Sequence, residues 1–458
     1  MPEASPDYAT LVQEALSLPI PEVVRRDDVL EELPRPARYN LVHIITGCRR
    51  CGKTFYVFQL MRELLDQGVG KSRMFYFNFA DDRLSPQPPT LLNDVVEEYW
   101  RQVPEARSEG CYLFLDEVQE ADGWQGFCQR VAEHEMVTLV ITGSSSKLSA
   151  DEIASTFRGR SQEHRIFPLS FREYCRFHGV ETPEAGELQA AGAVAPQQRT
   201  ALEAAYDRFL VEGGFPGVQA LPAGDRIQVL QGYMRDVVAR DVVERCRRID
   251  IALANQIALF ALRNTGCELS INNLTESLKR VGYRTSWETV NEAVRLFCQA
   301  HLIELLPEHA TSLAPSTTAT PKVYAADQGM AHATARANQQ DVGKRLETAV
   351  HIELSRRLAK GRMETMTSYT MPSAKREKVD FLIGDALANE PYELYQVTMN
   401  LDSSKTRRRE TGSLEAAMRA TGITEGTIIT LRGNDELQVD EGTIHVIPAW
   451  MWALKGNA

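Results

Sequence analysis

The sequence predicts an α/β fold whose first part is built around a parallel sheet. An apolar, β-branched run at residues 41–46 leads directly into a glycine-containing loop and then into a helical pattern. Further apolar runs alternate with helical patterns as far as residue 145. This alternation is typical of a parallel sheet with helices on both faces. At 458 residues, the chain is long enough for about three domains.

The composition is that of a soluble globular protein, with 43% hydrophobic and 25% charged residues. No apolar stretch reaches the length of a membrane-spanning helix, and the N-terminus has no signal-peptide pattern. We therefore expect a cytoplasmic protein without membrane contact, whose eight cysteines are reduced. The net charge of −11 argues against a globally basic nucleic-acid binder, but it leaves room for a local basic patch.

Residues 1–35 are expected to form a short helix and a proline-punctuated linker, and residues 36–170 to form the first α/β domain. Within that domain the apolar runs predict strands at 41–46, 73–79, 111–117 and 137–145. The patterns between them predict helices at 54–68, 88–103 and 123–135.

From Pro168 the strand signals stop, and residues 171–250 are expected to form a helical lid. Residues 251–335 show three helical patterns, a strand, a polar loop and a strand, which is the order of a winged helix. Residues 336–458 return to an α/β pattern. There we expect a helix at 342–360, strands at 378–384 and 392–400, a helix after Arg409, and strands at 426–431 and 442–448.

The loop after the first strand fits the pattern G-x-x-x-x-G-K-[ST] of a phosphate-binding loop. It consists of Gly47, Cys48, Arg49, Arg50, Cys51, Gly52, Lys53 and Thr54. Such a loop directs backbone N–H groups and a helix N-terminus at the phosphates of ATP. Lys53 would contact the β- and γ-phosphates, and the Thr54 hydroxyl would bind Mg²⁺. The motif predicts ATP and Mg²⁺ as cofactors.

A second acidic signal closes the third apolar run, at Asp116 and Glu117. Asp116 is expected to hold the Mg²⁺ ion, directly or through water, and Glu117 to polarise the attacking water. The alternative for Glu117 is an ordinary solvent-facing residue at a strand end. Together with the phosphate loop, the pair predicts ATP hydrolysis.

Hydroxyl side chains follow the fourth strand. Thr142, Ser144 or Ser145 could sense the γ-phosphate, and ordinary turn chemistry is the other interpretation. Farther on, Arg158 and Arg160 are candidates for an arginine that completes a neighbouring subunit's site. A plain surface arginine is the alternative for both.

Cys48 and Cys51 form a C-x-x-C pair within the phosphate loop. A disulfide there would deform the loop and would give redox control of ATP binding. No thioredoxin-like unit surrounds the pair, and these loop positions tolerate many residues. We therefore expect two ordinary thiols.

Taken together, these motifs resemble the prokaryotic AAA+-like ATPases that carry a C-terminal restriction-endonuclease-like domain of unknown function. The resemblance covers about residues 35–430. It is carried by GCRRCGKT, LDEVQ followed by Trp124, VITGSSSKLS, FRGR, PLSFREY, GGFP, RDVVERC, KVYAADQG, GKRLETAVHIEL, KVDFLIG and ELYQVT. It implies an AAA+-type αβα core, an arginine finger at Arg160 and a sensor at Ser144 or Ser145.

The C-terminal domain looks like a degenerate nuclease of the PD-(D/E)XK type. Glu347 and Asp380 fit the first two carboxylate positions that would hold Mg²⁺. Gln396 and Thr398 stand where Glu-x-Lys is expected, so a ligand and the cation are missing. Glu393 would face the opposite side of its strand and cannot replace Gln396. We expect no nuclease activity, with Glu347 and Asp380 kept as structural or DNA-contact residues.

Local clusters of positive charge make DNA contact a hypothesis for this domain. The candidates are Arg356, Arg357, Lys360, Arg362, Lys405, Arg407, Arg408 and Arg409. A solvated helix face is the alternative for any such run. The expected recognition helix of the winged helix, at 286–300, is not basic, so a role in packing domains together is an equal interpretation.

The function predicted from the sequence is ATP hydrolysis by a homo-oligomer, expected to be a ring, that acts on DNA as a remodelling motor or a DNA-associated switch. Branched DNA is the substrate suggested by analogy with junction resolvases. Two alternatives stay open. One is an ATP-dependent regulatory switch that binds a protein partner, and the other is an ATP-gated, Mg²⁺-dependent nuclease.

Overall fold

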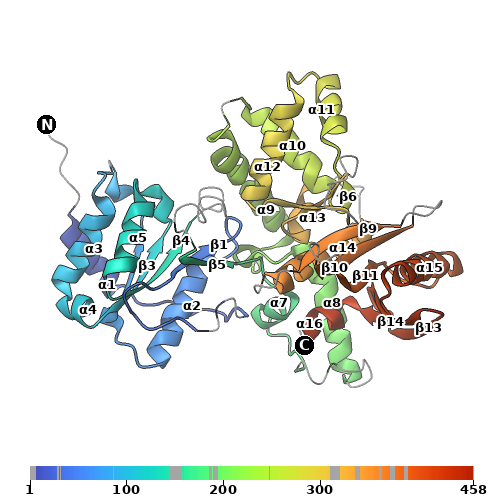
Figure 1. Cartoon of the computed structure of the whole chain (residues 1–458), viewed down its shortest axis with the longest axis horizontal. Helices are drawn as coiled ribbons and strands as arrows, with labels where there is room; N and C mark the ends of the chain where they lie inside the picture. Colours follow the sequence, from blue (N-terminus) through green and yellow to red (C-terminus); the bar gives the residue numbers. More distant parts are fainter. Residues whose placement is uncertain are drawn as a thin grey trace. The chain divides into compact units, whose positions relative to one another are not determined.

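The computed structural model describes residues 7–456, apart from 28–29, 31, 86, 144–156, 158, 185–187, 189–193, 247, 310–319, 336–340, 360–363, 372–376 and 386–389. The chain divides into two compact units (Figure 1). Unit 1 comprises residues 1–166 and unit 2 comprises residues 167–458. The domain boundaries expected within unit 2 stay predictions.

Unit 1 contains a five-stranded parallel sheet with the strand order β2-β3-β4-β1-β5. Its strands are β1 (Val42–Thr46), β2 (Met74–Asn78), β3 (Cys111–Asp116), β4 (Val137–Thr142) and β5 (Ser161–Arg165). Every residue of β1, β3 and β4 is buried, as expected for central strands covered on both faces. The four strands predicted from apolar runs are all present.

The edge strand β5 was not predicted, because its sequence, SQEHR, is polar. It pairs in parallel with β1 at the edge of the sheet. A strand at the edge has only one neighbouring strand and is less buried, so it tolerates polar residues. His164 of β5 is buried and stacks on His43 of β1, with ring centroids 5.4 Å apart. Burial lowers the pKa of His43 to about 4, so its ring is neutral at pH 7.

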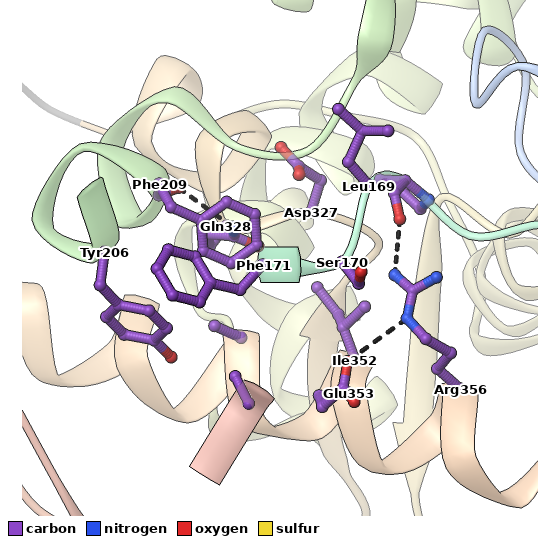
Figure 2. A pocket seen from close by; sticks show the side chains of 13 residues that line it. Leu169, Ser170, Phe171, Tyr206, Phe209, Asp327, Gln328, Ile352, Glu353 and Arg356 are labelled. Carbon is purple, nitrogen blue, oxygen red and sulfur yellow. Dashed lines mark hydrogen bonds and ion pairs between the residues drawn. The ribbon is translucent and has the colours of Figure 1, made fainter. Parts of the chain in front are cut away.

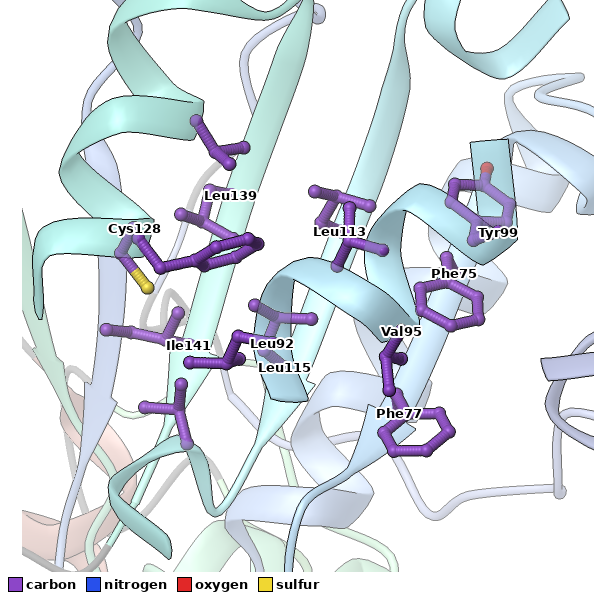
Figure 3. Packing of buried hydrophobic residues seen from close by; sticks show 14 of the residues in the cluster. Phe75, Phe77, Leu92, Val95, Tyr99, Leu113, Leu115, Cys128, Leu139 and Ile141 are labelled. Carbon is purple, nitrogen blue, oxygen red and sulfur yellow. The ribbon is translucent and has the colours of Figure 1, made fainter. Parts of the chain in front are cut away.

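Helices cover both faces of the unit 1 sheet. They are α1 (Tyr8–Ser17), α2 (Lys53–Asp66), α3 (Leu91–Gln102), α4 (Pro104–Ser108) and α5 (Trp124–His134), with short 3-10 turns η1 (Lys71–Arg73), η2 (Asp82–Leu84) and η3 (Val118–Glu120). Residues of α1, α3 and α5 share one buried cluster with alternate strand residues such as Leu113, Leu115 and Leu139. Figure 3 shows the part of this cluster between the strands, α3 and α5. Complete burial of each such side chain contributes about 1.5–3 kcal/mol. The buried residues of α2 are absent from this cluster, because α2 packs on the opposite face.

The first part of unit 2 is helical, as predicted. It contains α7 (Phe171–Phe177), α8 (Pro196–Glu212), the turn η6 (Pro216–Val218) and α9 (Ala223–Val237), which continues into the π-helix η7 (Val238–Val243). Ser170 and Glu173 form a capping box that fixes the start of α7.

A small antiparallel sheet with the order β6-β8-β7 follows. Its strands are β6 (Cys267–Glu268), β7 (Ile303–Leu306) and β8 (Lys322–Ala325). The accompanying helices are α10 (Ile251–Arg263), α11 (Ile271–Arg280), α12 (Trp287–Gln299) and α13 (Gln328–Thr334). The three helical patterns and the two longer strands expected here are present, and the short β6 was missed.

The C-terminal part contains a six-stranded mixed sheet with the order β13-β14-β12-β11-β10-β9. Its strands are β9 (Thr365–Thr370), β10 (Lys378–Asp385), β11 (Glu390–Val397), β12 (Glu425–Thr430), β13 (Asp435–Val439) and β14 (Gly442–Pro448). Its helices are α14 (Val342–Leu358), α15 (Ser404–Thr421) and α16 (Ala449–Lys455).

Three of these elements were not predicted. The outer strands β9 and β13 are rich in polar residues, and α16 is short. One boundary was wrong, because α15 begins at Ser404 and not after Arg409. The basic run therefore lies on the first turns of a helix.

The hydrophobic core of unit 2 crosses the expected domain boundaries. Side chains from α7 and α8 share one buried cluster with side chains from α14, β10 and α16.

Within the described residues, no helix combines the length and the apolar character that a membrane crossing requires.

Candidate nucleotide site

The phosphate loop lies between β1 and α2, as the sequence predicts. Gly47 and Gly52 have φ values of 138° and 106°, which L side chains rarely adopt. A Cβ at Gly47 would lie 2.2 Å from the carbonyl oxygen of Ile166, so only glycine fits there. Gly52 precedes α2 without a side-chain cap. The first N–H groups of α2 are therefore not capped by the preceding side chain, and this suits them to an anionic ligand.

Lys53 is folded back over this loop. Its Nζ donates to the carbonyl oxygens of Gly47, at 3.0 Å, and Cys48, at 3.1 Å. The residue is only 8% exposed. Because these partners are neutral carbonyls, a bound phosphate would offer the ammonium a stronger, charge-assisted contact.

Asp116 is buried and accepts hydrogen bonds from three hydroxyl groups. Thr54 donates to Oδ2 at 2.9 Å, Tyr76 donates to the same oxygen at 2.8 Å, and Thr142 donates to Oδ1. Thr54 and Asp116 are the two predicted Mg²⁺ ligands, and the structure brings their oxygens together. A carboxylate and a hydroxyl are suitable oxygen ligands for Mg²⁺, so the residues present fit this ion.

Tyr76 of β2 is a site residue that the sequence analysis missed, since it lies in an ordinary apolar strand pattern. Burial raises the pKa of its phenol, and the negative charge of Asp116 raises it further. Tyr76 therefore stays protonated and acts as a permanent hydrogen-bond donor to Asp116.

Glu117 follows directly after β3 in a left-handed backbone conformation, with φ at 52°. This conformation is uncommon for a residue other than glycine. Its backbone N–H donates to Thr142 Oγ1 at 3.2 Å, and its carboxylate accepts from Gln119 Nε2 at 2.6 Å. The side chain is partly exposed, in contrast to that of Asp116. The Glu117 carboxylate is therefore accessible to a water molecule.

The predicted sensor and arginine-finger residues lie partly outside the described residues. Ser144, Ser145 and Arg158 are among the residues that the structure does not describe. Thr142 is described, and its hydroxyl joins Asp116 to the backbone of Glu117. Arg160 has a side chain that is 59% exposed and paired with Glu133. A guanidinium with this exposure is accessible to a neighbouring molecule.

The two loop cysteines are buried free thiols. Burial raises the pKa of the Cys51 thiol, but a hydrogen bond from Cys48 and the charges of Lys53 and Arg26 outweigh this and lower it overall. The hydrogen bond to Cys51 raises the pKa of Cys48. Redox control by this pair stays a hypothesis.

The segment before β1 is more than a linker. Arg26 is buried, and its guanidinium donates to the carbonyl oxygen of Cys51 at 3.0 Å. Its backbone N–H donates to Gln59 of α2 at 2.7 Å, and Leu30 N–H donates to the Tyr56 hydroxyl at 3.0 Å. These contacts fasten the segment to the phosphate loop and α2. A single arginine in a proline-rich stretch gave no signal of this role.

We expect Thr142→Val to lower the rate of ATP hydrolysis about 10- to 100-fold, because Asp116 loses a donor and the Glu117 N–H loses its acceptor. The turnover rate should be measured as a function of Mg²⁺ concentration. Thr142→Ser restores the hydroxyl and should recover most of the activity. Thr138→Val is a matched control, because Thr138 lies near the other end of β4 and donates to Pro34. Equal losses in all three variants would contradict this positioning role.

Two of the predicted DNA contacts must be corrected. Arg356 donates to the carbonyl oxygen of Pro168 at 2.6 Å and pairs with Glu353 (Figure 2). Arg357 donates to the carbonyl oxygen of Trp452 at 2.9 Å and lies over the Trp452 ring. Both side chains are less than a fifth exposed. They hold α14 in the core of unit 2 and are not available to a phosphate backbone.

The basic start of α15 stays exposed. Arg407 pairs with Asp435 and Arg409 with Glu410, while Lys405 and Arg408 also lie on the surface. Lys360 and Arg362 are outside the described residues.

Three of the four residues expected to form a degenerate nuclease site, Glu347, Asp380 and Gln396, lie close together in unit 2. Lys322 of β8 donates from Nζ to Glu347 Oε1 and to Asp380 Oδ1, each at 2.9 Å. Gln396 accepts from the backbone N–H of Asp380 at 3.3 Å, whereas Thr398 points to Asn400. Lys322 was not predicted to lie beside these carboxylates, since it precedes Glu347 by 25 residues and belongs to the segment expected to form a winged helix.

Comparison with known proteins agrees with the assignment of residues 47–54 as a phosphate-binding loop. Residues 39–175 match the model of the AAA domain family, and residues 203–341 match a domain of unknown function, DUF8612. An uncharacterized protein of Methanocaldococcus jannaschii is 29% identical over 443 residues, which cover 94% of this chain and 91% of that protein. An uncharacterized protein of Haemophilus influenzae is 24% identical over 335 residues, covering 73% and 79% of the two chains.

Among solved structures, the Walker-type ATPase of Pyrococcus abyssi aligns with a TM-score of 0.38 and 12% identity, covering 72% of this chain and 95% of that one. The Aeropyrum pernix Orc1 protein in complex with DNA aligns with a TM-score of 0.27 and 17% identity, covering 71% and 89%. The AAA family match spans both the phosphate loop and the acidic end of β3. It supports an AAA-type P-loop ATPase domain at residues 39–175.

Proposed function

We propose that this protein hydrolyses ATP with Mg²⁺ and couples hydrolysis to DNA, as an oligomeric remodelling motor or DNA-associated switch. The observation that carries the ATPase part is the convergence of Thr54, Asp116 and Thr142 beside the phosphate loop. Lys53 would bind the phosphates, Thr54 and Asp116 would hold Mg²⁺, and Glu117 would accept a proton from the attacking water. Bound Mg²⁺ would neutralise charge on the phosphates.

The oligomer would place Arg160 of one subunit at the ATP of the next, where it would stabilise the charge of the transition state. Its exposed side chain supports this role. Glu133 holds the guanidinium in the single chain, so this surface pair must break for the role to be fulfilled. Exposed ion pairs contribute less than about 1 kcal/mol, so the rearrangement requires little free energy.

DNA contact would use the exposed start of α15, at Lys405, Arg407, Arg408 and Arg409. We infer that the small sheet and α10–α12 of unit 2 form a winged helix, and that the six-stranded sheet belongs to an inactive endonuclease-like domain that would retain a nucleic-acid surface. The proposed substrate is duplex or branched DNA.

The second candidate is an ATP-dependent switch that binds a protein partner. Its support is that the basic surface is smaller than the sequence suggested. Arg356 and Arg357 are internal, and Arg407 and Arg409 have acidic neighbours. An ATP-gated nuclease is disfavoured, because Gln396 does not supply the third carboxylate and Thr398 does not supply the positive charge of the Glu-x-Lys pair.

To test the DNA role, ATP hydrolysis should be measured without DNA and with single strands, linear duplex and a four-way junction. We expect one DNA form to stimulate turnover, and we expect stimulation to fall with salt because phosphate contacts release counterions. Lys405→Ala combined with Arg408→Ala should weaken stimulation and leave basal turnover unchanged. Arg419→Ala, at the other end of α15, is the matched control.

Lys53→Ala should abolish turnover under every condition, which ties the signal to this site. A rate that is the same with and without every DNA form would remove the DNA role. It would leave the ATPase in place and favour the protein-directed switch.

A further inference from the structure

Glu347 and Asp380 are the two carboxylates that the proposed endonuclease-like domain would use to hold Mg²⁺. They come from α14 and β10 and meet at one nitrogen, Lys322 Nζ, which lies 2.9 Å from an oxygen of each. All three side chains are less than a fifth exposed. The positive charge between these carboxylates is therefore part of the chain itself.

Two further donors contact these carboxylates, one on the Glu347 oxygen that Lys322 already contacts and one on the other oxygen of Asp380. The Tyr324 hydroxyl donates to Glu347 Oε1 at 2.7 Å, and the backbone N–H of Val397 donates to Asp380 Oδ2 at 3.0 Å. Gln396 bridges two partners, since its Oε1 accepts from Asp380 N–H and its Nε2 donates to Glu410 at 2.8 Å. The third ligand position of a nuclease site is thus occupied by an amide that contributes to the local network.

The test of fit for Mg²⁺ is negative. A divalent cation needs several oxygen ligands, and an ammonium at 2.9 Å from two of them would repel it. Among the described residues, no group of three His, Cys, Asp or Glu side chains is placed to hold a metal ion. The residues present do not fit the cofactor that the endonuclease-like fold implies.

We propose that the Lys322 ammonium takes the place that a divalent cation would have between Glu347 and Asp380 and excludes metal from this pair. Lys322 then has two effects. It compensates two buried carboxylates, and it ties β8 of the small sheet to α14 and β10 of the larger one. This inference rests on the proposed endonuclease-like fold of the C-terminal part, and it does not depend on the ATPase or DNA proposals.

The electrostatics of the three side chains agree with this assignment. Burial lowers the pKa of Lys322, but the charges of Asp380 and Glu347 outweigh this and raise it overall, so the ammonium stays charged. Burial and the charge of Asp380 raise the pKa of Glu347. The Tyr324 phenol, whose pKa burial also raises, contacts Glu347, and Glu410 contacts Gln396. None of these supplies a second positive charge.

The test measures Mn²⁺ binding to the full chain without nucleotide, by the loss of the electron paramagnetic resonance signal of free Mn²⁺. With Lys322 present, the single variant Asp380→Asn should bind as much Mn²⁺ as wild type, because no metal binds to this pair. Lys322→Met keeps the length of the side chain and removes its charge. It should gain one bound Mn²⁺ per chain, and the double variant Lys322→Met/Asp380→Asn should lose that ion again.

A second readout follows the thermal unfolding midpoint, Tm. Millimolar Mn²⁺ should raise the Tm of Lys322→Met and leave that of Lys322→Met/Asp380→Asn unchanged, because a ligand that binds only the folded state stabilises it. Two results would overturn the proposal. One is an Mn²⁺ site in the wild-type protein that the Asp380→Asn substitution removes. This result can be obtained even if the Lys322→Met protein does not fold. The other is a folded Lys322→Met protein that binds no additional Mn²⁺.

Discussion

Replacing Glu117 by Gln is expected to reduce the rate of ATP hydrolysis by at least about 100-fold while ATP binding is retained. General base catalysis contributes about 10²- to 10⁴-fold, and an amide cannot accept the proton of the attacking water. The substitution keeps the size of the side chain. It also keeps an oxygen that can accept from Gln119, which now contacts Glu117 at 2.6 Å. The backbone of Glu117 is held by Thr142 and should be unaffected.

The measurement compares single-turnover hydrolysis with equilibrium binding of ATP. Glu109→Gln makes the same chemical change on an exposed residue before the opposite end of β3, so it controls for the change in charge. If Glu117→Gln hydrolysed ATP at the wild-type rate, Glu117 would not be the catalytic base. If Glu117→Gln failed to bind ATP, the substitution would have damaged the phosphate loop. Glu117 would then have a structural role in the site.

Asp327→Ala is expected to destabilise unit 2 by about 2–5 kcal/mol. Asp327 is 1% exposed, and its carboxylate accepts from the backbone N–H of Gly214 at 2.6 Å and from that of Met330 at 2.8 Å. Each buried donor left without an acceptor costs about 1–3 kcal/mol. Asp327 therefore joins the turn before η6 to the start of α13.

Hydrogen–deuterium exchange reports this loss locally. Peptides covering residues 209–219 and 326–334 should exchange at least about tenfold faster in Asp327→Ala, since tenfold corresponds to about 1.4 kcal/mol of opening free energy. Peptides from β1 and β3 should exchange at the wild-type rate. Asp225→Ala, an exposed carboxylate at the start of α9, is the surface control. Unchanged exchange around Gly214 would show that Asp327 does not hold the turn.

The difference between wild type and Asp327→Ala should depend on pH. Burial raises the pKa of Asp327 to about 6, against backbone hydrogen bonds that lower it, while the ordinary value is 3.8. A carboxyl whose pKa is raised by folding contributes stability below its unfolded pKa, and this contribution is lost as the pH rises through the folded pKa. The stability advantage of wild type should therefore shrink between about pH 4 and pH 6 and stay constant above about pH 7.

The segments that carry the family resemblance have different roles in the structure. The GGFP turn at 213–216 and the start of α13 in KVYAADQG form one structural contact through Asp327, whose Oδ1 would lie 2.2 Å from a Cβ at Gly213. This explains why glycine occupies that position. In the phosphate loop, Gly47 and Gly52 have positive φ values, and a Cβ at Gly47 would meet the carbonyl oxygen of Ile166.

The sequence alone determined the elements whose signals are local. Strands β1, β3 and β4 are continuous apolar runs because both of their faces are buried, and the phosphate loop is a contiguous motif. The residues expected to bind ATP and Mg²⁺ can therefore be named from the order of amino acids. The edge strands β5 and β13 cannot, because a strand with one open edge and an exposed face needs no apolar pattern.

Only the tertiary structure decided which distant side chains meet. The order β2-β3-β4-β1-β5 places β4 between the phosphate-loop strand and the acidic strand, and this brings Thr142 to Asp116 and Glu117. The pairing of β2 with β3 brings Tyr76 to the same carboxylate. Lys322 reaches Asp380 across 58 residues of sequence. Local periodicity reflects which face of an element is buried, whereas such contacts depend on strand order and register, which are set by the packing of the whole unit.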